Sequence, residues 1–109
     1  MVQKLWNPKE IYITENGCAA LDVIGADGRI YDTDRIMFLR CHPTELQRAT
    51  REGIPVNGYF LWSFMDNFEW SAGYANRFGM IYVDYATQKR TPKSSADFMK
   101  ELSRIKKVV

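Results

Sequence analysis

Apolar and polar positions along the chain predict two buried strands and one shorter strand. Residues 9–14 contain a nearly continuous apolar run, which is typical of a strand buried on both faces in a parallel sheet. Residues 54–64 (IPVNGYFLWSF) are rich in β-branched and aromatic side chains and predict a second buried strand. Residues 80–85 (MIYVDY) predict a further, short strand.

Two helices are predicted, one between the long strands and one near the C-terminal end. The first begins at Asp34, which can cap it, and ends at Gly53. Pro43 lies inside this helix, where a proline costs roughly 3 kcal/mol, so a kink or break is expected there. The second helix begins with Thr91 as its cap and Pro92 at its first position. Its single apolar stripe consists of Phe98, Leu102, Ile105 and Val109.

The remaining segments predict loops and complete an α/β pattern. Residues 17–33 and 66–79 are too polar and too rich in Gly or Asp for a strand or a regular helix. The order strand, loop, helix therefore occurs twice, within a chain of 109 residues that is one domain at most. Parallel βα units place Glu15 and residues 66–79 at the same edge of the sheet, where α/β barrels build their active sites.

Composition excludes several classes of function. The 15 basic and 13 acidic residues are mixed along the chain, so no basic stripe predicts nucleic-acid binding. No apolar run reaches the length of a membrane span, and residues 1–10 lack the apolar core of a signal peptide, so we expect a soluble, cytoplasmic protein. Cys18 and Cys41 are expected to be reduced thiols. His42 is the single histidine and the two cysteines are not clustered, so we expect no metal site. No cofactor is expected either.

The segment ITENG at residues 13–17 has two interpretations. In the structural one, a strand is followed by a tight turn at Asn16-Gly17, and Glu15 is a solvated residue between them. In the functional one, Glu15 is a carboxylate presented for catalysis at the end of a strand. The pattern alone leaves both open.

Aromatic, acidic and amide side chains alternate between residues 62 and 78. Aromatic rings pack against the C–H face of a sugar while carboxylates and amides bind its hydroxyl groups, so the mixture suits a carbohydrate pocket that includes Asp66 and Asn67. The structural alternative makes the aromatics core and the charges solvent-facing. We favour that alternative for Phe60, Leu61 and Phe64. For Trp62, Glu69 and Trp70 we favour the sugar site, because an acidic group between large aromatics is costly to bury without a partner.

The ordered motifs resemble a known family. ITENG at 13–17, GYFLWSFMDNFEW at 58–70 and GYANRFG at 73–79, followed by YVDY, Arg90, Lys93 and Ser95, are similar to the C-terminal part of glycoside hydrolase family 1, the retaining β-glucosidases. The resemblance covers nearly the whole chain. It implies that residues 1–109 are the last two βα units, strands seven and eight, of a single eight-stranded α/β barrel (a TIM barrel), incomplete on their own.

The resemblance also implies a role for five residues. Glu15 matches the catalytic nucleophile, and Trp62 matches the platform for the sugar at the cleavage site. Glu69 and Trp70 match the pair that binds hydroxyl groups of the non-reducing sugar, and Phe78 matches an aromatic residue that lines the same pocket. Members that act on phosphorylated sugars do not keep the Glu-Trp pair, so the resemblance implies an unphosphorylated β-glucoside; glucose, galactose and fucose remain open.

One part of the machinery is absent from residues 1–109. Retaining hydrolysis uses two carboxylates about 5–5.5 Å apart, and the family places the general acid/base in an Asn-Glu-Pro motif, which this sequence lacks. We therefore expect this chain alone to be inactive, and to self-associate or pair with the missing part of the barrel. The alternatives are a non-catalytic fragment or carbohydrate-binding α/β module that oligomerises, and a plain oligomeric α/β protein without a ligand.

Overall fold

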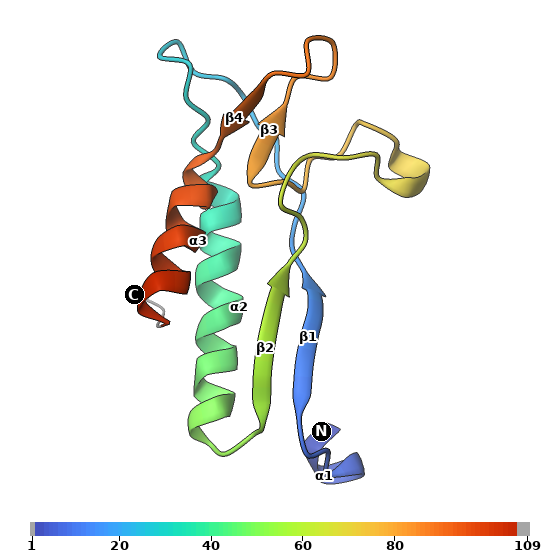
Figure 1. Ribbon diagram of the computed structural model, residues 1–109, viewed down its shortest axis with the longest axis vertical. Coiled ribbons are helices and arrows are strands. Elements are labelled where there is room, and N and C mark those ends of the chain that lie inside the picture. The colour runs from blue at the N-terminus through green and yellow to red at the C-terminus, as the bar shows by residue number, and fades with distance from the viewer. Residues whose placement is uncertain (1, 107–109) are drawn as a thin grey trace.

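The computed structural model describes residues 2–106 and contains two strand, loop, helix units. Figure 1 shows two long strands beside two packed helices, with loops and a small hairpin gathered at one end. The elements are α1 (Val2–Trp6), β1 (Ile11–Asn16), α2 (Thr33–Arg51), β2 (Val56–Leu61), the 3-10 turn η1 (Trp70–Ala72), β3 (Ile81–Val83), β4 (Arg90–Pro92) and α3 (Ser94–Ile105).

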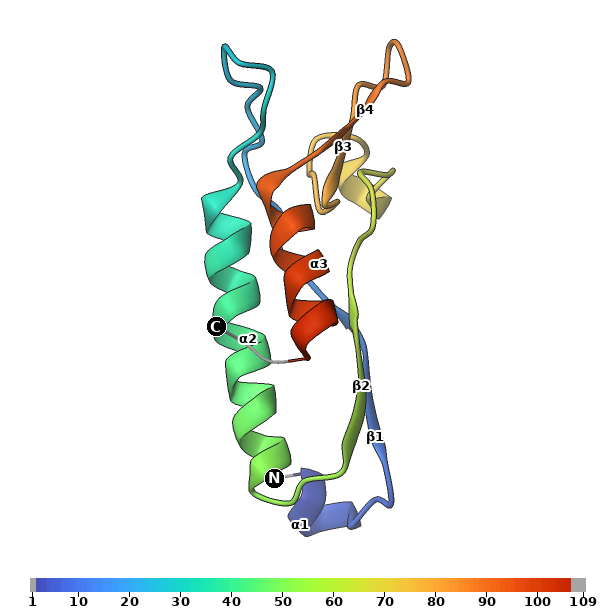
Figure 2. The same cartoon turned by 60° about the vertical axis from the view of Figure 1, so that its left-hand side comes forward.

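Strands β1 and β2 form a parallel pair, as expected. Ile13 pairs with Tyr59 and Asn16 with Leu61, so the C-terminal ends of both strands meet at one edge. The expected burial on both faces is wrong, since every residue of β1 is exposed or half-buried. Both helices lie on one side of the strand pair, which leaves the other side open (Figure 2).

Helix α2 runs without interruption through Pro43, contrary to the expected break. Two side chains next to Pro43 bind carbonyls of the preceding turn: Thr44 Oγ1 donates to the Arg40 oxygen at 2.5 Å, and His42 Nδ1 lies 3.0 Å from the Phe38 oxygen. Burial of the proline ring further offsets the cost of the missing N–H.

The ends of α2 differ by one or two residues from the expected ends. The helix begins at Thr33, so Asp32 is its N-cap and Asp34 lies in its first turn. It ends at Arg51, and Gly53 has a φ of 87°, the left-handed conformation that favours glycine after a helix.

Helix α3 begins at Ser94 rather than at Pro92. Thr91 and Pro92 belong to β4, which pairs antiparallel with β3, so neither can cap the helix. Pro92 is tolerated there because it ends a short strand at the edge of the hairpin. Three members of the expected stripe, Phe98, Leu102 and Ile105, are half-buried. The fourth, Val109, lies outside the described residues.

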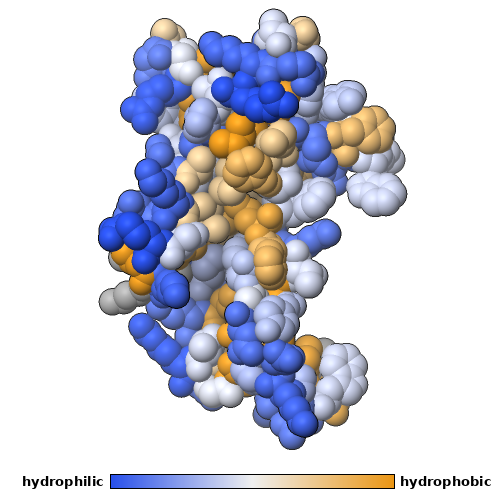
Figure 3. Space-filling model, in the orientation of Figure 1, coloured by the Kyte–Doolittle hydropathy of each residue, from blue (hydrophilic) through white to orange (hydrophobic). Residues whose placement is uncertain are grey.

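The buried apolar core of residues 2–106 is small and consists of Ile30, Leu39 and Val83. Phe60 and Phe64, expected in the core, are 59% and 65% exposed. Successive side chains of a strand point to opposite faces, which explains the exposure of Phe60. Its neighbour Tyr59 lines the groove between β2 and the helices α2 and α3, so Phe60 faces the uncovered side. Figure 3 shows apolar side chains exposed in a band along the middle of the molecule. No helix within residues 2–106 is both long and apolar enough to cross a membrane.

Candidate functional site

Glu15 lies at the C-terminal edge of the parallel strand pair. It is the next-to-last residue of β1, and its side chain is exposed. Strand β1 extends to Asn16, two residues beyond the expected end at Thr14. A carboxylate at this edge is accessible to a ligand bound between the loops that follow β1 and β2.

Gly17 brings the end of β1 into contact with the start of the loop after β2. The Trp62 N–H donates to the Asn16 oxygen at 3.1 Å, and a Cβ placed on Gly17 would lie 1.8 Å from the Trp62 carbonyl oxygen. Gly17 is not among the glycines with positive φ and lies in no turn, so the tight turn at Asn16-Gly17 that the structural interpretation required is not formed. Glycine is required here because the two chain segments touch.

Trp62 and Glu69 lie together, although they are seven positions apart along the chain. The Trp62 Nε1–H donates to Glu69 Oε2 at 3.3 Å, and both side chains are half-buried. The Glu69 N–H in turn donates to the Gly73 oxygen at 2.7 Å, which closes a tight loop around η1. The indole and the loop backbone therefore fix the position of the Glu69 carboxylate.

The two remaining candidate residues occupy different environments. The half-buried Phe78 lies beside the segment that carries Trp62, because its carbonyl oxygen accepts from the Ser63 N–H at 3.3 Å. The Trp62-Ser63 peptide bond is cis. Trp70 is 84% exposed and has a φ of 42°. The structure thus brings Trp62, Glu69 and Phe78 to one region and leaves the Trp70 ring in solvent.

Aromatic rings support the loop that carries Glu69. Phe68 meets Tyr74 edge to face, with ring centroids 5.4 Å apart, and Tyr74 packs on Tyr85 at 4.4 Å. The Arg77 guanidinium lies 4.6 Å from the centre of the Tyr85 ring, a cation–π contact. The Tyr85 hydroxyl donates to the Asn67 carbonyl oxygen at 3.3 Å, so these packed rings also hold the backbone of the loop.

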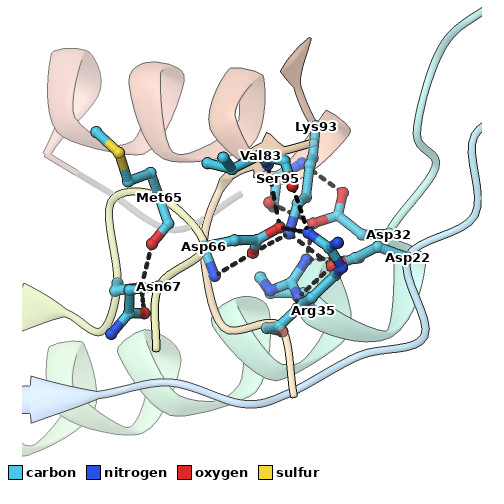
Figure 4. Close-up of polar contacts among 12 residues, drawn as sticks. Asp22, Asp32, Arg35, Met65, Asp66, Asn67, Val83, Lys93 and Ser95 are labelled. Atoms are coloured by element: carbon cyan, nitrogen blue, oxygen red, sulfur yellow. Dashed lines mark hydrogen bonds and ion pairs between the residues drawn. The ribbon is translucent and has the colours of Figure 1, made fainter. Parts of the chain in front are cut away.

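Behind this loop lies a cluster of buried charges, shown in Figure 4. We call it the ion cluster. Its members are Asp22, Asp32, Arg35, Asp66, Arg77 and Lys93. The expectation that Asp66 faces a sugar is wrong, since its carboxylate is fully buried and pairs with Lys93 and Arg77 at 2.8 and 2.6 Å.

Arg35 joins the ion cluster to helix α2. It donates two parallel hydrogen bonds to Asp22, each of 3.1 Å, another to Asp32, and a fourth to the Arg77 carbonyl at 2.8 Å. Burial by itself lowers the pKa of Arg35, but the hydrogen bonds and charges of the two aspartates outweigh it, so the pKa is raised. The guanidinium therefore stays charged at neutral pH.

Asp32 caps a helix other than the one it precedes. Its side chain makes no capping bond to α2, and instead accepts from the Ser95 N–H at 2.9 Å and from the Ser95 hydroxyl at the start of α3. Sequence reasoning missed this cluster, because the loop residues 17–33 carry no periodicity and the partners lie far apart along the chain. The signal available was the position of Asp32 and Lys93, each directly before a helix.

The contribution of Tyr59 to stability at the strand edge can be tested by varying the pH. Its hydroxyl donates to Asn16 Oδ1 at 2.9 Å, and burial, with a smaller effect of Cys18, raises the pKa of Tyr59 to about 12. An unfolded tyrosine ionises near pH 10, so the stabilisation is present below about pH 10 and is lost as pH rises toward 12. The free energy of unfolding, measured with urea at about pH 9 and about pH 11, should fall less in Tyr59→Phe than in the wild type. An equal fall in both proteins would contradict this role.

The possible metal ligands and the two cysteines form neither a metal-binding cluster nor a disulfide in the part of the chain that the structure describes. Residues 2–106 contain no group of three or more His, Cys, Asp or Glu side chains able to hold a metal ion. Cys18 and Cys41 are free, and burial raises the pKa of the Cys18 thiol.

Comparison with known proteins decides the family. The model of "Glycosyl hydrolase family 1" matches residues 1–108. The chain belongs to glycosyl hydrolase family 1. Two relatives illustrate the range of names within the family. This chain is 53% identical over 94 residues to Beta-glucosidase A of Thermotoga maritima and 50% identical over 102 residues to 6-phospho-beta-galactosidase of Leptotrichia buccalis.

These matches cover most of the chain and a small part of each family 1 relative. They span 86% and 94% of this chain, but only 21% and 22% of the relatives. The solved structure of the family 1 β-glucosidase from Thermotoga maritima superposes with a TM-score of 0.93 at 48% identity, over 94% of this chain and 23% of that one. Family 1 β-glucosidases are (β/α)8 barrels, and residues 1–109 correspond to a fraction of one.

Proposed function

We propose that residues 1–109 act within a complete family 1 barrel as strands seven and eight of a retaining β-glucosidase. In this proposal they supply the nucleophile, Glu15, and the loop that binds the non-reducing sugar. The observation that carries the proposal is the contact between Trp62 and Glu69, placed next to the end of β1 by the contact between Gly17 and Trp62.

The proposed reaction proceeds in two displacements. A Glu15 carboxylate oxygen attacks the anomeric carbon, and the bond from that carbon to the leaving oxygen breaks. A second carboxyl group, supplied by another part of the barrel and protonated at this stage, gives its proton to the leaving oxygen and becomes a carboxylate. The same group then removes a proton from water, which attacks the anomeric carbon and releases Glu15.

Each sugar-binding residue has a distinct task in this proposal. The Trp62 ring packs against the sugar, while its N–H holds one oxygen of Glu69 and leaves the other oxygen for sugar hydroxyl groups. Phe78 lines the pocket beside Trp62. Trp70, exposed in this chain, offers its indole N–H to the sugar from the outer side of the loop.

The loop chemistry favours an unphosphorylated β-glucoside. The relative from Leptotrichia buccalis raises the alternative of a 6-phosphoglycoside, whose phosphate needs cations nearby. Residues 54–76 contain no Lys or Arg, and the next cation, Arg77, is already paired with Asp66. The Glu69 carboxylate would also repel a phosphate.

By themselves, residues 1–109 should bind a sugar weakly and leave cellobiose intact, because they contain no Asn-Glu-Pro motif to provide the acid. The non-catalytic alternative is less favoured, since the relatives are glycosidases. We propose further that the free edges of β1 and β2 pair with the remaining strands of the barrel, and that the open face carrying Phe60 is covered in its interior.

The test uses a complete barrel in which residues 1–109 follow the preceding part of Thermotoga maritima Beta-glucosidase A. We expect it to cleave an aryl β-glucoside and not the matching 6-phosphoglucoside. Glu69→Gln should raise KM and lower kcat/KM by roughly tenfold or more, because charge-assisted hydrogen bonds contribute roughly 1.5–3 kcal/mol each. Preference for the phosphorylated substrate, or unchanged kinetics of Glu69→Gln on the glucoside, would reject the assignment.

A further inference from the structure

One buried amino group binds carboxylates from both of the loops that follow β1 and β2. Lys93 Nζ lies 2.5 Å from Asp22 Oδ2 and 2.8 Å from Asp66 Oδ1, and all three side chains are fully buried. Asp22 belongs to the loop after Glu15, and Asp66 belongs to the loop that carries Trp62 and Glu69. Figure 4 shows the Lys93 amino group pointing toward both carboxylates.

Neither of the other two cations of the ion cluster, Arg35 and Arg77, pairs with carboxylates of both loops. Arg35 pairs with Asp22 and Asp32, which both precede α2, and Arg77 pairs with Asp66 inside its own loop. Lys93 approaches from the start of α3, outside both loops, so its position is set by an element that carries none of the proposed sugar-binding groups.

The base of the second loop is fixed to Asp66 by further bonds. Asp66 accepts from the Gly79 N–H at 3.0 Å and from the Val83 N–H at 3.3 Å. A Cβ on Gly79 would lie 2.1 Å from the Asp66 nitrogen, so these segments are in direct contact. Any shift of Asp66 would therefore move the loop that positions Trp62.

Electrostatics make the bridge stiff. The ion cluster contains three carboxylates and three cations, so its formal charges cancel. A carboxylate that moved away from Lys93 would become an unpaired charge in a site closed to water, which is strongly unfavourable. Lys93 consequently restrains the distance between Asp22 and Asp66, because losing either ion pair is strongly unfavourable.

We propose that Lys93 is a positioning residue that holds the Glu15 strand end and the Trp62–Glu69 loop at the separation required for attack on the sugar. The inference rests on the proposed function, since it assigns Glu15 and Glu69 to the same reaction. Its physical basis is that an error of about 1 Å in the placement of reacting groups can reduce a rate about 100-fold.

The experiment uses the complete barrel defined above with Lys93→Met combined with Asp66→Asn. This pair of changes removes one charge of each sign, so the remaining cluster stays balanced while the bridge to Asp22 is lost. Exposed residues of α3 provide the matched control, Arg104→Met with Glu101→Gln, which removes an ion pair of 2.8 Å far from the loops. Asp22→Asn, which keeps one acceptor oxygen, is a milder second variant.

The readout separates positioning from folding. Labelling with an activated 2-deoxy-2-fluoroglucoside gives the number of functional sites from its stoichiometry and the rate of attack per site from its saturating rate constant. A purely structural role for Lys93 would lower the stoichiometry and leave the rate per site unchanged. We expect a rate per site reduced by about tenfold or more in the double variant and by a smaller factor in Asp22→Asn, with no change in the control.

Failure of the inference and failure of the proposed function give different results. A wild-type barrel that is folded and neither labels nor cleaves a β-glucoside would reject the proposed function. An active wild-type barrel with a wild-type rate per site in Asp22→Asn, and in whatever folded fraction the double variant yields, would reject the positioning role of Lys93.

Discussion

Replacing Glu15 with Gln in the complete barrel should lower kcat for an aryl β-glucoside by roughly 10,000-fold, in the range seen when an essential nucleophilic or triad group is removed. The amide keeps the shape of the side chain but cannot form the glycosyl ester. Because Glu15 is exposed, the midpoint of thermal unfolding should stay close to that of the wild type. Steady-state kinetics and calorimetry measure the two effects.

Glu10 provides the matched control for this prediction. It is an exposed glutamate just before β1, at the opposite end of the strand, where it accepts from the Tyr12 hydroxyl at 3.0 Å. Glu10→Gln should leave kcat unchanged. In the wild type, mass spectrometry after treatment with a 2-deoxy-2-fluoroglucoside should locate the sugar on Glu15. A label on another residue would remove Glu15 from the role of nucleophile.

Gly17→Ala should be the most destabilising small substitution at the strand edge. Its methyl group would lie 1.8 Å from the Trp62 carbonyl oxygen, which belongs to backbone and cannot rotate away. We expect a loss of about 3 kcal/mol or more in the free energy of unfolding, measured with denaturant, since overpacking against rigid atoms forces the backbone to shift.

Gly53→Ala separates this steric effect from ordinary backbone strain. A Cβ on Gly53 would meet nothing within 4 Å, but its φ of 87° is unfavourable for alanine. This variant should lose only about 1–2 kcal/mol. Equal losses for the two alanine variants would show that the contact between Gly17 and Trp62 is not the cause.

The order of the two long strands and the two long helices could be predicted from sequence because it depends on local patterns, whereas α1 and β4 were not predicted. Apolar runs and the left-handed Gly53 indicated β1, β2 and the end of α2. The start of α3 was predicted wrongly, because pairing of β3 with β4 places Thr91 in a strand, and such pairing is invisible in a local window. Pro43 likewise was tolerated through burial and neighbouring side chains, which periodicity does not report.

The candidate site, like the fold, was predicted only in part from sequence. The motif order indicated that Trp62 and Glu69 act together, and their hydrogen bond shows that they are neighbours. Asp66 was misassigned because its partner Lys93 lies 27 residues further along the chain, and Lys93 in turn bonds Asp22 across 71 residues. A local pattern cannot tell a buried paired carboxylate from one that faces a ligand.

The ion cluster also has a consequence for recombination between family members. Its charges come from the loop after β1, helix α2, the loop after β2 and the residue before α3. A crossover that exchanges some of these positions between parents with different cluster residues leaves an odd charge in a dry interior. Crossover libraries should therefore inherit residues 22–93 as one block, and hybrids that divide this block should be lost at the folding step.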